Sequence, residues 1–71
     1  MIEVFKTNIE DLPTAQRVST RLNAQFPDYH LAFDLDDCDH ILRVASKAGV
    51  KVNAVIQTVE RCNVEIAVLE D

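Results

Sequence analysis

The segment "FDLDDCDHILRV", residues 33–44, concentrates side chains that could hold a metal ion or take part in catalysis. Carboxylate, thiolate and imidazole groups are the ligands that proteins use for Zn(II) and related ions. Within this segment the candidate ligands are Asp36, Cys38, Asp39 and His40. A charged surface turn would also contain such residues, because aspartate is a common turn residue. Whether the segment is a metal site or a charged turn depends on how the neighbouring strands and helices orient these side chains.

Catalysis is a third hypothesis for the same residues. Cys38 and His40 could in principle form a thiolate nucleophile. The sequence contains no Gly-rich phosphate loop, no GxSxG motif and no Ser/His/Asp order. In so small a fold nothing shields the pair or supplies an oxyanion hole. We therefore predict that the protein is not an enzyme and carries no cofactor.

The composition predicts a small soluble domain. Apolar residues make up 48% of the 71 residues, and no stretch approaches the roughly 18 apolar residues of a membrane span. The net charge is −5, and the seven basic residues are scattered, whereas nucleic-acid binding needs clustered cations. No signal peptide opens the chain, so we expect a cytoplasmic protein in which Cys38 and Cys62 are free thiols.

The spacing of apolar residues predicts four strands and two helices. Some segments alternate apolar and polar residues, as strands do, and others repeat apolar residues every three or four positions, as helices do. The predicted strands cover 2–5, 29–35, 40–45 and 64–69, and the predicted helices cover 13–26 and 52–62. Asp11 is the expected N-cap of the first helix. Cys62 completes the apolar face of the second helix, and Asn63 is expected to end it in a left-handed conformation.

This βαββαβ order predicts an α+β fold, the ferredoxin-like sandwich. Two helices would cover one face of a four-stranded antiparallel sheet. Right-handed crossovers would place the first strand beside the third rather than beside the second. A single domain over residues 1–71 accounts for the whole sequence.

The chain resembles the heavy-metal-associated domain family, which comprises small copper chaperone-like modules of about this length. The resemblance covers nearly the whole chain and includes the opening "IEVFKTNI", which is similar to the family's first strand. It implies the same fold. The family's metal loop, Met-x-Cys-x-x-Cys, follows that strand and holds a soft ion such as Cu(I) between two thiolates. Here the loop is "TNIEDLPT", without cysteine, so the resemblance assigns no metal ligand in this chain.

A hairpin centred on Asp37 and Cys38 would separate the candidate ligands. Phe33 would then face Leu42, which pairs two apolar residues on the core side. In this register His40 points toward the helices, whereas the neighbouring aspartates, Asp34, Asp36 and Asp39, point to the open face of the sheet. We therefore favour a solvated acidic turn over a metal site.

The uncovered face of the sheet suggests how the protein could act. The alternation places Phe5, Ile41 and Leu69 on this face among charged residues, which is how a contact surface is composed. A homodimer formed through this face would add burial to a small core. The predicted function is a non-catalytic module that acts through protein contacts, by self-association. The alternative is a metal-handling protein that uses Cys38 with nearby Asp or His side chains.

Overall fold

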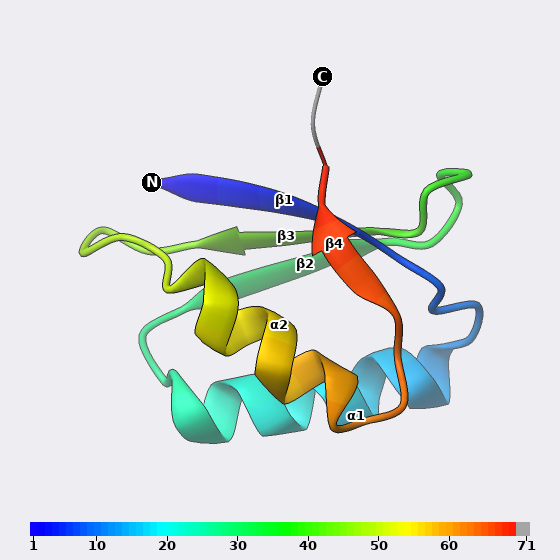
Figure 1. Ribbon diagram of the computed structural model, residues 1–71, viewed down its shortest axis with the longest axis horizontal. Coiled ribbons are helices and arrows are strands. Elements are labelled where there is room, and N and C mark those ends of the chain that lie inside the picture. The colour runs from blue at the N-terminus through cyan, green and yellow to red at the C-terminus, as the bar shows by residue number, and fades with distance from the viewer. Residues whose placement is uncertain (70–71) are drawn as a thin grey trace.

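The computed structural model describes residues 1–69 and confirms the predicted βαββαβ order. The elements are β1 (Ile2–Thr7), α1 (Leu12–Gln25), β2 (His30–Asp34), β3 (Ile41–Ala45), α2 (Val52–Glu60) and β4 (Ile66–Val68). Both helices lie on the same side of the sheet (Figure 1). Glu70 and Asp71, the last residues of the predicted domain 1–71, lie outside the described residues.

The four strands form one antiparallel sheet in the order β2-β3-β1-β4. β1 pairs with β3 and not with β2, as the crossover rule predicts. Each helix therefore carries the chain past one strand: α1 passes β3 and α2 passes β1. No helix within residues 1–69 is long and apolar enough to cross a membrane.

The core lies between the sheet and the two helices. One row of apolar side chains crosses all four strands, because successive pairings join Phe33 to Leu42, Leu42 to Phe5 and Phe5 to Val68. The helices cover this row with side chains at the three- and four-residue spacing of one helical face. These are Ala15, Val18 and Leu22 of α1, and Val55 and Val59 of α2, all buried.

The helix boundaries follow the expected signals with small differences. Asp11 is the N-cap of α1 and has extended backbone, but its side chain makes no capping hydrogen bond. Asn63 has a positive φ of 61°, as predicted for the end of α2. The helix itself ends at Glu60, and Cys62 lies in the following turn, where its N–H donates to the Val59 carbonyl at 2.9 Å.

The predicted faces of β1 are wrong. Phe5 is fully buried in the core rather than exposed on the open face, since it pairs with Leu42 and Val68 of the core row. Ile2 and Val4, which alternate with Phe5, face away from the helices instead. The pattern of β1 has apolar residues in both phases, so the partners on β3 and β4, rather than the alternation, decide which phase is buried.

The corrected face of β1 leads to a stability prediction. Replacing Phe5 with alanine should lower the free energy of unfolding by about 3–5 kcal/mol, because the change leaves a cavity in the core. Its exposed neighbour Lys6 lies on the opposite face, and Lys6→Ala should change the same quantity by no more than about 0.5 kcal/mol. Urea unfolding followed by circular dichroism measures both. Equal effects would mean that Phe5 is not in the core.

Candidate functional site

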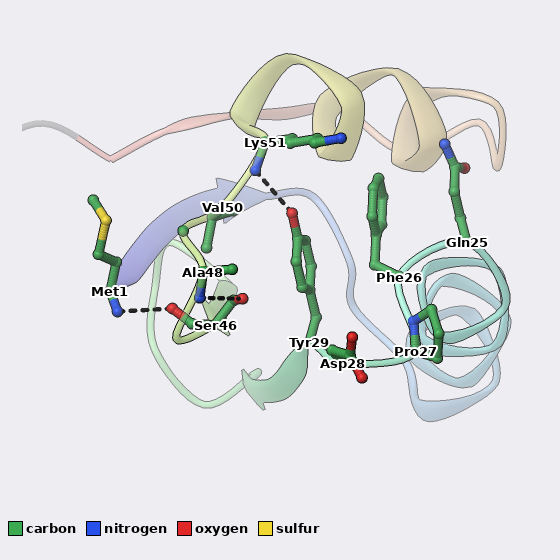
Figure 2. A pocket seen from close by; sticks show the side chains of 11 residues that line it. Met1, Gln25, Phe26, Pro27, Asp28, Tyr29, Ser46, Ala48, Val50 and Lys51 are labelled. Atoms are coloured by element: carbon green, nitrogen blue, oxygen red, sulfur yellow. Dashed lines mark hydrogen bonds between the residues drawn. The ribbon is translucent and has the colours of Figure 1, made fainter.

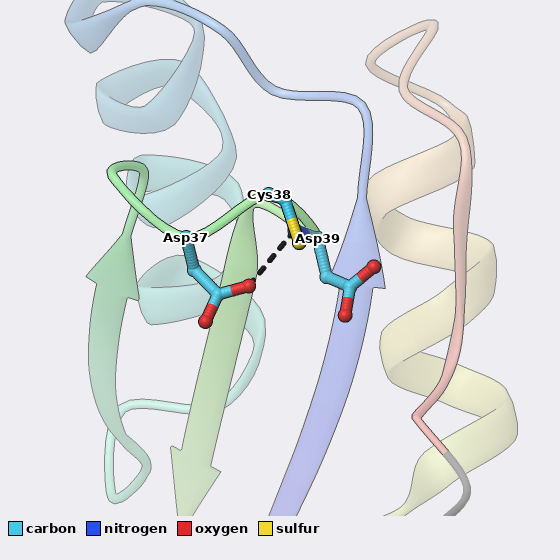
Figure 3. Close-up of side chains that lie close together, drawn as sticks. All are labelled: Asp37, Cys38 and Asp39. Carbon is cyan, nitrogen blue, oxygen red and sulfur yellow. Dashed lines mark hydrogen bonds between the residues drawn. The ribbon is translucent and has the colours of Figure 1, made fainter.

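The tip of the β2–β3 hairpin brings together Asp37, Cys38 and Asp39. One ligand atom from each lies within 4.8 Å of the others. Figure 3 shows the three side chains projecting from the loop in the same general direction. Cys38 and Asp39 are exposed. An Asp37 carboxylate oxygen, Oδ1, accepts the Asp39 N–H at 2.9 Å, so this carboxylate stabilises the turn.

The structure assembles only part of the predicted ligand set. Cys38 and Asp39 belong to the group, but Asp36 and His40 do not, and Asp37 joins instead. The predicted hairpin register is confirmed from His30 to Asp34, where Phe33 faces Leu42. The strands do not extend beyond Asp34 and Ile41. Between them the backbone of the loop, including a φ of 47° at His40, determines where the candidate ligands point, and strand alternation does not.

His40 is held by its backbone and not by its ring. Its N–H donates to the Asp37 carbonyl at 3.0 Å, and its carbonyl accepts the Thr7 hydroxyl at 2.6 Å. The ring nitrogen Nδ1 is buried and has no hydrogen-bond partner among residues 1–69. The Thr7 N–H also donates to the Asp39 carbonyl at 3.0 Å. The hairpin loop is thereby fixed to the end of β1.

The loop from β1 to α1 lies at the same end of the sheet as the hairpin tip, because Thr7 at the end of β1 bonds to Asp39 and His40. Ile9 of this loop is buried in the core and anchors it there. The Asn8 side chain accepts the Glu65 N–H at 3.0 Å, which joins the loop to the start of β4. Cys62 is only 6% exposed and packs in the core, as expected for a structural thiol. Cys38 is therefore the one exposed thiol of the chain.

The predicted interface residues do not form one exposed patch. Phe5 is in the core, as described above. Ile41 lies on the open face, since it pairs with Asp34, but it is only 3% exposed and is covered by its own chain. Leu69 lies beside Val4, since its N–H donates to the Val4 carbonyl at 2.9 Å. Its side chain is half-buried. Ile2, which is 67% exposed, is the large apolar residue that the open face presents to solvent.

A hollow of about 520 Å³ lies at the opposite end of the sheet, where β1 and β2 begin and β3 ends. Figure 2 shows the rings of Phe26 and Tyr29 in its wall; they stack with centroids 4.6 Å apart. The Tyr29 hydroxyl accepts the Lys51 N–H at 2.9 Å, which ties the start of α2 to the start of β2. None of the predicted site residues lines this hollow.

Comparison with known proteins supports the fold alone. No family model and no curated protein matches the chain. Among solved structures, the chain is similar to the yeast copper transporter domain CCC2A, determined in solution in its apo and Cu(I)-loaded states. The TM-score is 0.79 with 14% sequence identity, and the match covers 99% of this chain and 96% of that one. The likeness confirms the ferredoxin-like fold that the resemblance to heavy-metal-associated domains implied.

The two thiols should differ sharply in reactivity. A thiol-reactive dye should label Cys38 of the native protein quickly, whereas Cys62 should react only when the core opens, because it is buried. Mass spectrometry of the labelled peptides measures the two rates separately. Cys38→Ser should abolish fast labelling, and Cys62→Ser should leave it intact. Fast labelling of the Cys38→Ser protein would contradict the burial of Cys62.

Proposed function

We propose that this protein is a non-catalytic module that acts through protein contacts and self-associates through the open face of its sheet. The observation that carries the proposal is Ile2, an isoleucine on a central strand that is 67% exposed. Val4 and Leu69 lie beside one another on the same face and are half-buried. We call Ile2, Val4 and Leu69 the open-face cluster.

The energetics favour covering the open-face cluster. Fully burying a large aliphatic side chain contributes roughly 1.5–3 kcal/mol, which is considerable beside the small stability of a short domain. A second copy is a suitable partner, because a two-fold interface needs a surface that complements itself. The same face carries Lys6 and Arg43 together with Asp34, so it offers both signs of charge to a second copy.

Replacing Ile2 with glutamate tests self-association. The side chain is exposed in the single chain, so Ile2→Glu should leave the fold intact, and it should dissociate the dimer by placing a charge in the interface. Light scattering over a range of protein concentrations measures the mass, and circular dichroism checks the fold. Gln16→Glu, an exposed change of the same charge on α1, is the matched control and should leave the dimer intact. A wild-type protein that stays monomeric at the highest concentration would defeat the proposal.

Metal handling at the hairpin tip is the second candidate function. It is favoured by the closeness of the three ligand atoms of Asp37, Cys38 and Asp39, and by the fold likeness to a domain solved with Cu(I). The donor set is one thiolate and two carboxylates, which suits a divalent ion such as Zn(II) better than Cu(I), because Cu(I) prefers soft sulfur ligands. The cluster would leave other coordination positions for water or for a partner's side chain.

Metal titration separates this candidate from a chaperone of the two-thiolate type. We expect no Cu(I) retained against a strong chelator, because the loop after β1 offers no thiolates. If the hairpin tip handles metal, native mass spectrometry should show one Zn(II) per chain, lost in Cys38→Ser and kept in Cys62→Ser. Retention of one equivalent of Cu(I) would contradict the first expectation, and Zn(II) binding that survives Cys38→Ser would rule out the hairpin site.

A further inference from the structure

A second hollow, of about 260 Å³, is lined by residues of both helices and of the turn after α2. Its walls are formed by Arg21, Ala24 and Gln25 of α1 together with Thr58 of α2 and Arg61, which follows α2. Two of these side chains are cationic and none is acidic, although the chain has 12 acidic and only seven basic residues. The fold therefore concentrates positive charge here in a protein whose net charge is −5.

The guanidinium groups of Arg21 and Arg61 are free to bind a ligand. Arg17, one turn before Arg21, uses its Nη2 to donate to the Cys62 carbonyl at 2.9 Å, near the end of α2. Within residues 1–69, the side chains of Arg21 and Arg61 make neither an ion pair nor a hydrogen bond. Each guanidinium group therefore has five N–H donors available to a ligand.

Thr58 orients one more donor among the residues that line the hollow. Thr58 is buried, and its hydroxyl lies 2.8 Å from the Gln25 side-chain oxygen and 2.8 Å from the Ala54 carbonyl. Because the Gln25 oxygen faces the threonine, the amide nitrogen of Gln25 is left to donate elsewhere. The hollow thus combines two cationic donor groups with a neutral one.

We propose that this hollow between α1 and α2 is a binding site for an oxyanion group, a phosphate or a carboxylate. A guanidinium group matches two oxygens of either group with parallel N–H bonds, and two of them can hold one anion from different sides. A cation would meet repulsion from Arg21 and Arg61 and would find no carboxylate in the wall. The net charge of the chain repels anions in general, so binding requires the local charge of this hollow.

A purely structural role for the arginines is the competing explanation. A cation near the end of a helix offsets the partial negative charge of the last carbonyls, and Arg61 is the C-cap of α2. Arg17 already bonds to a carbonyl beyond that helix end, and Arg21 lies on the other helix. Helix stabilisation therefore gives no reason for Arg21 to line the hollow.

Nitrogen-15 NMR titrations with inorganic phosphate and, separately, with acetate test the proposal. At constant ionic strength set with sodium chloride, phosphate should produce saturable shifts at Arg21, Gln25, Thr58 and Arg61. Saturation by both anions would indicate a general oxyanion site, and saturation by phosphate alone would indicate a phosphate site. Linear shifts that equal those produced by chloride would overturn the proposal.

Substitution of the two lining arginines tests whether phosphate binds in this hollow. Arg61→Gln and Arg21→Gln should each weaken phosphate binding by about ten-fold or more, because each removes charge-assisted hydrogen bonds. Arg43→Gln, the same change on the open face of the sheet, should leave the affinity unchanged. Circular dichroism confirms that each variant is folded. Unchanged affinity in the double variant Arg21→Gln, Arg61→Gln would place the binding elsewhere and reject this site.

Discussion

One row of apolar side chains, which crosses the sheet from Phe33 through Leu42 and Phe5 to Val68, constrains both the sheet and the helices that pack on it. It sets the register of every strand pair, because a shift by one residue would turn each of these side chains to the opposite face. The helices pack on this row, so their orientation also follows from it. In a domain this small, each of these contacts is a large share of the whole core.

The same register determines what each end of the molecule contains. It brings the tip of the β2–β3 hairpin to the end of β1, where Thr7 bonds to the carbonyl oxygens of Asp39 and His40. The only exposed thiol, Cys38, therefore projects from a loop that is anchored on a central strand rather than from a free tip. At the other end, Tyr29 and Lys51 join the starts of β2 and α2. Of the two thiols, Cys38 is exposed at the hairpin tip and Cys62 is buried in the core, so they do not form the exposed pair of thiolates that a Met-x-Cys-x-x-Cys loop offers to Cu(I).

The two outer surfaces of the sandwich differ in chemistry, which is why the proposals for them are independent. The open face of the sheet presents Ile2 together with residues of both charges elsewhere on the same face, a composition suited to a protein partner. The helical layer presents a small hollow with Arg21 and Arg61 in its wall, a composition suited to an anion. Failure of one test would leave the other unaffected, because the sheet and its core separate the two surfaces.

Four features could be predicted from the sequence alone: the order of the elements, the antiparallel pairing of β1 with β3, the hairpin register and the burial of Cys62. Each of these follows from local spacing, from chain connectivity or from one matched apolar pair. The buried face of β1, by contrast, depends on the assembled sheet. The segment "IEVFKT" has apolar residues in both phases, and the pairing of Phe5 with Leu42 and Val68 distinguishes them. The tertiary structure also grouped Asp37 with Cys38 and excluded His40, since turn hydrogen bonds and a positive φ, not strand alternation, orient side chains in a loop. The hollow between the helices could not be predicted, because Arg21 and Arg61 are 40 residues apart in the chain and meet only when α1 packs against α2.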